Sequence, residues 1–127
     1  MKRRVVSSPD LPAKIGPYSH AVCANGFVFV AGQPGVDPKT SEPAGPTFVE
    51  QARQAFANLD AVLRAAGSRP ELVVNTTVLV ADQASFGELN ELFAAFFPSD
   101  PPARMTMQVP LPHGLLISIG CTAVVDD

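Results

Sequence analysis

The sequence is poor in the residues that build covalent or metal-bound frameworks. Its 127 residues include two cysteines and two histidines. Cys23 and Cys121 lie in apolar stretches far apart in the chain, His20 and His113 are equally isolated, and no CxxC or HxxxH pair is present. This pattern argues against a disulfide framework and against a structural zinc site. We expect two small buried thiols in a reducing compartment, no metal and no cofactor.

Basic charge and long apolar runs are also missing. Nine Lys and Arg stand against twelve Asp and Glu, a formal net charge of −3. Proteins that hold nucleic acid by its phosphates need a basic face, so nucleic acid is not a partner that we expect. No apolar run comes near the roughly 20 residues that span a bilayer, and the basic start at residues 1–9 lacks the apolar segment of a secretory signal. We therefore expect a cytoplasmic protein with no membrane partner.

The chain does have enough apolar material for one packed domain. Hydrophobic residues make up 46% of the sequence and charged residues 17%, which favours a single folded domain over residues 1–127. Strands are predicted at 4–7, 21–24 and 27–31. Asn25-Gly26 between the last two is the strongest short signal for a two-residue hairpin. Residues 32–46, rich in proline and glycine, are expected to form an irregular loop.

Two helices are predicted from capping patterns followed by apolar periodicity. Thr47 and Glu50 have the spacing of a capping box, an apolar stripe follows at helical intervals, and Gly67 supplies a left-handed stop. Ser85 and Glu88 repeat the capping pattern before a second helix that ends ahead of Pro98.

The remaining strands are predicted at 72–80, 104–109 and 115–125, the last two as a pair joined through 110–114. The order is β-β-β-α-β-α-β-β, and two helices can cover only one face of such a sheet. In the last strand neither alternating set, 116 to 124 or 115 to 123, contains a charge. We infer that the second face is buried against another copy of the chain.

Arg104 is the charged residue with the clearest chemical meaning. It is the only Lys, Arg, Asp or Glu between Pro101 and Val125, and alternation places it on one strand face with Thr106 and Gln108. A guanidinium without a nearby carboxylate suits a bidentate organic acid. The alternatives are a head group that reaches water and one that pairs with a distant Asp or Glu.

Two other polar residues are candidates for a site. Tyr18, the only tyrosine, follows the rigid turn Gly16-Pro17 and either closes a pocket or lies half-buried at the surface. Asn90 interrupts an apolar helix and either caps a loop or lines a site. We find no Ser/His/Asp or Cys/His constellation, no carboxylate pair for acid–base chemistry, and no phosphate loop around Gly32.

Several segments together resemble the RidA family, also called YjgF and, by an older label, endoribonuclease or translation inhibitor. The match runs in order along essentially the whole chain, and its GPYS and PAR pieces are specific. The matching segments are IGPYSHA (15–21), VAGQ (30–33), Gln51…Asn58-Leu59…Leu63…Ala66-Gly67, Phe86…Asn90…Phe93…Phe97 and PAR (102–104).

The resemblance implies an α+β, chorismate-mutase-like fold in a homotrimer with its sheets facing inward and pockets at the subunit interfaces. It implies hydrolysis of reactive enamines and imines, such as 2-aminoacrylate and small 2-imino acids, to 2-oxo acids and ammonia. By position, Arg104 would clamp the substrate carboxylate, and Tyr18 and Asn90 would line the pocket. Thr106 would lie close to the reacting water, and Gly32 would border the site through its backbone.

The chain departs from the family at one position. Members with deaminase activity usually carry a Glu in the last strand to activate water, and this position falls on Ser118. Loss of a positioned general base lowers a rate by about 10²–10⁴. The imine is already electrophilic, so Arg104, Thr106 and Ser118 can still accelerate its hydrolysis by placing substrate and water.

Three functions follow from these residues. The first is the deaminase, and the second is a non-catalytic trimer of the same fold that holds a small carboxylate, with Ser118 marking the lost chemistry. The third, a ribonuclease or translation inhibitor, is disfavoured by the net charge of −3 and by the absence of a basic aromatic stripe.

Overall fold

The computed structural model describes residues 2–125. The limits of the expected domain, residues 1 and 127, lie outside this range. The order of elements is the one predicted, with short 3-10 turns η1 (Pro70–Leu72) and η2 (Gln83–Ser85) added. The elements are β1 (Arg4–Val6), β2 (Ala21–Ala24), β3 (Phe27–Pro34), α1 (Phe48–Ala65), β4 (Val73–Val80), α2 (Phe86–Phe96), β5 (Ala103–Gln108) and β6 (Ile117–Val124).

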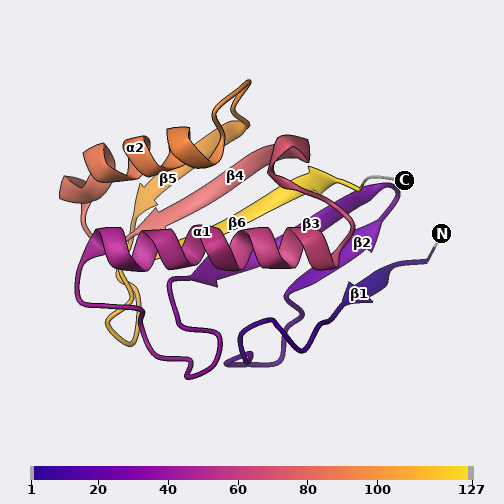
Figure 1. Cartoon of the computed structure of the whole chain (residues 1–127), viewed down its shortest axis with the longest axis horizontal. Helices are drawn as coiled ribbons and strands as arrows, with labels where there is room; N and C mark the ends of the chain where they lie inside the picture. The colour runs from indigo at the N-terminus through magenta and orange to yellow at the C-terminus, as the bar shows by residue number, and fades with distance from the viewer. Residues whose placement is uncertain (1, 126–127) are drawn as a thin grey trace.

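The strands form one mixed six-stranded sheet in the order β1-β2-β3-β6-β4-β5 (Figure 1). The predicted pairing of the last two strands is wrong, because β4 lies between them and β5 pairs with β4 in parallel. The strand β6 instead pairs antiparallel with both β3 and β4. Because β6 lies in the middle of the sheet, Ile117 and Ile119 are fully buried, and they would lie at the sheet edge if β6 were an outer strand.

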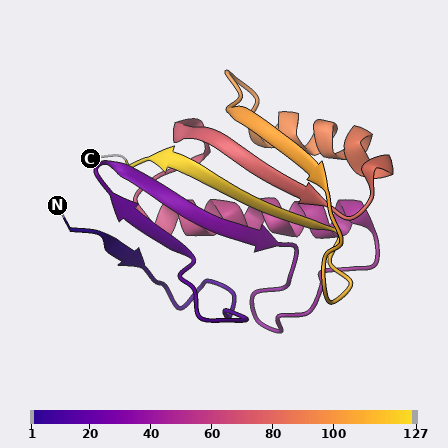
Figure 2. The same ribbon diagram turned by 180° about the vertical axis from the view of Figure 1, so that it is seen from behind.

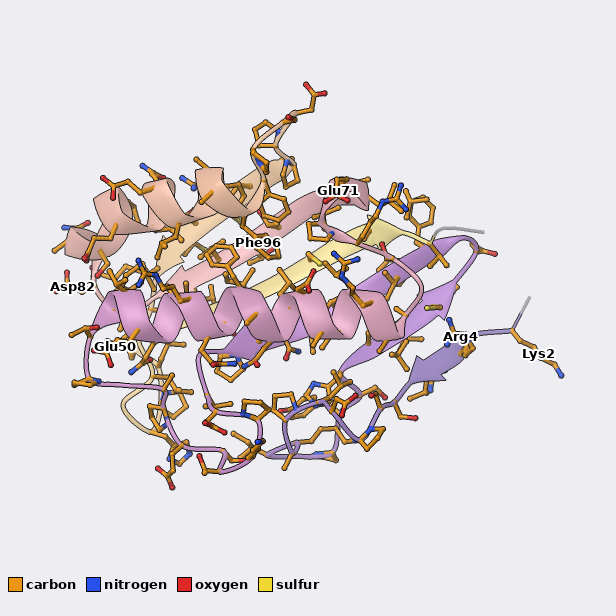
Figure 3. All side chains as sticks on the ribbon, viewed as in Figure 1. Lys2, Arg4, Glu50, Glu71, Asp82 and Phe96 are labelled. Atoms are coloured by element: carbon orange, nitrogen blue, oxygen red, sulfur yellow. The ribbon has the colours of Figure 1, made fainter. Side chains whose placement is uncertain are left out.

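Both helices pack on the same face of the sheet, with α1 crossing its middle and α2 lying over β4 and β5 (Figures 1 and 2). The apolar stripe of α1 is buried, with Ala52, Leu59 and Leu63 fully enclosed. The ring of Phe96 fills the space between the helices and lies 4.9 Å from the ring of Phe56 (Figure 3). The core therefore lies between the helices and one face of the sheet.

The expected turn and helix ends are confirmed at three places. Asn25 and Gly26 have φ values of 53° and 81°, as the tight turn between β2 and β3 requires. The Thr47 hydroxyl accepts the N–H of Glu50 at 3.2 Å and caps α1. After α1, Gly67 has a φ of 84°, and the N–H of Ser68 reaches back to the Leu63 carbonyl at 2.8 Å, which closes the helix.

The predicted cap of the second helix is wrong. Ser85 makes no side-chain cap bond, and Asp82 instead accepts the N–H of Ala84 at 2.9 Å, at the start of η2. This 3-10 turn runs directly into α2, so the capped end of the combined segment lies three residues earlier than the sequence pattern indicated.

The second face of the sheet carries no helix (Figure 2). Along β6, the set from Ile117 to Ala123 faces the core, and the set that includes Ser118 and Thr122 faces outward. Neighbouring strands add large apolar side chains to this open face, and these are 41–59% exposed. They are Phe27, Phe29, Val74, Met105 and Met107.

The two cysteines are buried and free, as expected. Burial raises the pKa of the Cys121 thiol from 9.0 to about 12, so this thiol is neutral near pH 7 and is not a nucleophile in the folded protein. Among residues 2–125, no three His, Cys, Asp or Glu side chains gather closely enough to hold a metal ion. Within the same residues, no helix combines the length and the apolar character that crossing a bilayer requires.

Buried amides of α1 hold the chain that leaves β3. The Asn58 amide donates to the carbonyls of Pro34 and Val36 at 3.0 and 2.9 Å. Gln51 donates to the carbonyls of Gly45 and Gly114 at 3.0 and 3.1 Å. Gly35 passes so close to α1 that a Cβ atom there would collide with the backbone carbonyl of Gln51. A glycine is therefore required at position 35 by close approach rather than by its φ angle.

This close approach predicts opposite effects for two alanine substitutions. Gly35→Ala should lower the free energy of unfolding by about 1–3 kcal/mol, because the loop or the helix must shift. Gly87→Ala should raise it by up to about 1 kcal/mol, because a Cβ on this helical residue meets nothing within 4 Å and alanine is the better helix former. Urea unfolding of both variants measures this difference, and a Gly35→Ala protein as stable as wild type would contradict the packing.

Candidate functional site

Arg104 lies at the start of the edge strand β5 and points to the helix-covered side of the sheet. Its guanidinium donates to the side-chain oxygen of Asn90 at 2.8 Å, and its central carbon lies 4.9 Å from the centre of the Phe93 ring. Asn90 and Phe93 are three residues apart on α2, so one helix face presents both. The amide and the ring thus hold the guanidinium in one orientation.

The charge of Arg104 has no carboxylate partner among residues 2–125. Ion pairs there link Arg64 to Asp60 and Arg69 to Glu71, both at 3.2 Å. Arg104 is exposed, and its single protein hydrogen bond leaves four of the five guanidinium donors for another molecule. Of the alternatives that the sequence left open, pairing with a distant acid is therefore not seen among residues 2–125.

Thr106 lies on the same strand face as Arg104. It pairs with Val78 in β4, whose side chain is fully buried under the helices. Its hydroxyl is buried and has no hydrogen-bond partner among the described residues. Buried hydroxyls are nearly always bonded, so an unpaired oxygen at this place, two residues along the strand from Arg104, is unusual.

Gly32 and Ser118 form a second group on the opposite face. A Cβ atom at Gly32 would lie 2.5 Å from the Ser118 hydroxyl oxygen. Gly32 falls where the pairing of β3 with β6 shifts, between Val30 and Gln33, so its backbone is bulged out of the regular ladder. The missing side chain at Gly32 leaves the space that the serine hydroxyl occupies.

Tyr18 lies in the segment that leads from β1 to β2 and is 42% exposed. Its hydroxyl accepts the N–H of Ile15 at 3.3 Å. It forms no hydrogen bond with Arg104, Asn90, Thr106 or Ser118 among residues 2–125. Within one chain, the structure thus brings Arg104, Asn90 and Thr106 to one face of the sheet and Gly32 and Ser118 to the other.

The sequence pattern indicates Asn90 as a site candidate, and Asn90 does contact Arg104, but the pattern does not indicate that Phe93 contacts Arg104 as well. Phe93 was assigned to the apolar face of α2, and it is buried there, yet its ring also supports the Arg104 guanidinium. The spacing of Asn90 and Phe93 was the available signal. The contact of Phe93 with Arg104 in β5 depends on how α2 packs on the sheet, and the spacing of residues within α2 does not predict that packing.

The structure is that of an α+β protein with an exposed arginine at a sheet edge that has no carboxylate partner among residues 2–125. The model of the family described as endoribonuclease L-PSP matches residues 9–125. The 2-iminobutanoate/2-iminopropanoate deaminase of Mus musculus is 42% identical over 123 residues, which cover 96% of this chain and 91% of that protein. Reactive Intermediate Deaminase A, chloroplastic, of Arabidopsis thaliana is 40% identical over 124 residues, 97% of this chain and 66% of that protein.

Solved structures agree with these relatives. The crystal structure of RidA from an Antarctic Psychrobacter bacterium superposes with a TM-score of 0.92 at 36% identity, covering 96% of this chain and 99% of that one. The chain belongs to the endoribonuclease L-PSP family, which is the RidA family. Its fold is the chorismate-mutase-like α+β fold that the sequence resemblance implied.

Proposed function

We propose that this protein hydrolyses reactive enamines and imines, with small 2-imino acids as substrates, to 2-oxo acids and ammonia. The observation that carries the proposal is the guanidinium of Arg104, which Asn90 and Phe93 hold in place and which no carboxylate of residues 2–125 pairs with. A planar fork held in this way matches the carboxylate of an imino acid in a bidentate pair. The two deaminases named above support the same reaction class.

The reaction depends on the positions of substrate and water more than on a strong acid or base. An enamine first becomes its imine by moving a proton to carbon. Water then adds to the imine carbon, and a proton moves to nitrogen. The carbon–nitrogen bond then breaks as the hydroxyl proton passes to the amino group, so that ammonia leaves and the 2-oxo acid remains. In this proposal Arg104 holds the carboxylate next to the reacting carbon, and Thr106, on the same strand face, lies close to the reacting water.

The site is proposed to be complete only between copies of the chain. Arg104 and Tyr18 lie toward opposite edges of one sheet, so a pocket lined by both requires two subunits. The open face, with Phe29 and Met105 half or more exposed, is the surface that such subunits would cover. We propose a homotrimer with its sheets inward and a small carboxylate or imino acid as ligand.

A second candidate function rests on Ser118. Strand β6 contains no acidic residue, so its outward set offers a hydroxyl where the resemblance implies a carboxylate base. A trimer that binds small carboxylates without turnover would show the same Arg104 geometry. RNA cleavage is not proposed, because the net charge of −3 opposes phosphate binding.

Arg104→Met should lower kcat/KM for imino-acid hydrolysis on the order of 10²-fold, because the carboxylate loses its bidentate partner. The assay generates imino acid with an amino-acid oxidase and follows its disappearance. Arg64→Met, which removes a surface arginine paired with Asp60, is the matched control and should keep wild-type activity. An acceleration by wild type that survives Arg104→Met would refute the proposed clamp.

Mixing two inactive variants tests the shared pocket. Arg104→Met and Tyr18→Ala subunits, refolded together at equal amounts, should regain about a quarter of wild-type activity, because a quarter of interfaces then carry both native side chains. Each variant refolded alone is the control, and light scattering gives the number of subunits. No recovery in mixed trimers would show that the two residues do not serve one site.

Ser118→Glu separates the two candidate functions. We expect kcat to rise by up to about 10²–10⁴, with little change in KM, because the carboxylate supplies a general base. Ser118→Ala is the control for loss of the hydroxyl. If wild type has a measurable rate and Ser118→Glu raises it, the protein is a deaminase with a lowered kcat. If wild type binds 2-oxobutyrate in calorimetry but hydrolyses no imino acid, the result supports the binding function.

A further inference from the structure

The segment that carries Tyr18 has few contacts of its own. Between β1 and β2, the N–H of Tyr18 bonds to the Gly16 carbonyl at 2.9 Å in a tight turn. The Tyr18 ring meets the ring of His20 edge-on, with centres 6.3 Å apart and planes at 82°. The position of Tyr18 therefore depends on what holds His20.

His20 is clamped between two parts of the chain. Its Nε2 lies 2.7 Å from the carbonyl of Pro12, at the other end of the same segment. Its Nδ1 lies 3.3 Å from the amide nitrogen of Gln33 in β3. The ring is 8% exposed and Gln33 is 1% exposed, so both bonds are shielded from water. Shielded bonds of this kind restrict the segment more than surface bonds do.

The partners determine which ring nitrogen carries the proton. The Pro12 carbonyl only accepts, so Nε2 of His20 must donate. The Gln33 amide nitrogen only donates, and it also donates to the Ala31 carbonyl at 3.1 Å, so Nδ1 must accept. A flipped Gln33 amide would set its oxygen against the Ala31 carbonyl. The arrangement is therefore a neutral His20 with the proton on Nε2.

Gln33 connects this histidine to the sheet. Both of its amide hydrogens are used, one on His20 and one on the carbonyl of Ala31, which precedes the bulged Gly32. Its own side-chain oxygen is buried and has no partner among the described residues. A buried unpaired carbonyl destabilises the fold, so the amide is poorly suited to stability alone.

We propose that His20 and Gln33 are positioning residues, which hold the Tyr18 segment and the Gly32 bulge in one fixed relation and thereby shape the substrate pocket. This inference rests on the proposed function, in which Tyr18 and Gly32 border that pocket. The His20–Gln33 pair links β3 to this segment, which is also held by the buried side chain of Leu11 and by the bond from the Ala31 N–H to the His20 carbonyl at 2.8 Å.

The protein contains one tyrosine and no tryptophan, so its tyrosine emission reports on Tyr18 alone. His20→Leu should increase acrylamide quenching of this emission about twofold and lower its anisotropy, because Tyr18 moves from 42% exposed toward full exposure. His20→Gln, which keeps hydrogen-bond donors and an acceptor but not the aromatic ring, should restore the wild-type values in part. In the active enzyme, His20→Leu should raise KM more than it lowers kcat.

The control is Val62→Ala, which removes a fully buried methyl pair from α1 and lowers stability without touching the His20–Gln33 pair. It should leave the quenching and anisotropy of Tyr18 unchanged. A folded His20→Leu protein with wild-type quenching and anisotropy would overturn the proposal. The emission is measured without substrate, so this outcome is distinct from failure of the deaminase proposal, which the Arg104 variant reports.

A measurement on the wild-type protein covers the case in which His20→Leu does not fold. Long-range proton–nitrogen NMR correlations distinguish the two neutral forms of imidazole, and the second histidine, His113, is assigned by its own substitution. We expect the Nε2–H form at His20, with Nδ1 as acceptor. An Nδ1–H form at His20 would contradict the Gln33 contact and overturn the proposal.

Discussion

Two helices cover one face of a six-stranded sheet, and the apolar residues of the other face are left in water. Phe29 and Met105 on that face are 50% and 59% exposed, which is unfavourable for a chain that stays alone. The same strand order that creates this face places Tyr18 and Arg104 toward opposite edges of the sheet. Assembly of copies would therefore bury the exposed face and bring separated residues of the proposed pocket together.

The proposed reaction suits a site with few side chains that act as a general acid or base. The thiol of Cys121 is neutral near pH 7 because burial raises its pKa to about 12, and the outward side of β6 offers Ser118 rather than a carboxylate. An imine is electrophilic enough to react with water that is merely well placed. In the proposed function, holding the substrate by its carboxylate is the main contribution of the protein, and Arg104, supported by Asn90 and Phe93, is the residue proposed for it.

The positions of the segments around the proposed site depend on polar side chains that are buried next to them. Asn58 and Gln51 of α1 fasten the chain after β3, and His20 with Gln33 fastens the segment before β2. Asn58 and Gln51 donate to carbonyls at the end of β3 and in loops, and Gln33 donates to the Ala31 carbonyl within β3, so these amides tie irregular segments to regular elements. The proposed pocket borders on loops, yet the shape of those loops is set from the core.

The sequence alone determined the elements, because their signals are local. Asn25-Gly26, Thr47 and Gly67 act within one turn of chain, and the stripe of α1 repeats at the helical period. The resemblance also predicted the family and the importance of Arg104. Only the tertiary structure decided that β4 separates β5 from β6, that Asp82 rather than Ser85 caps the second helical segment, and that Phe93 supports the guanidinium. These outcomes depend on burying Ile117 and Ile119 between strands distant in sequence, and no local pattern records such a choice.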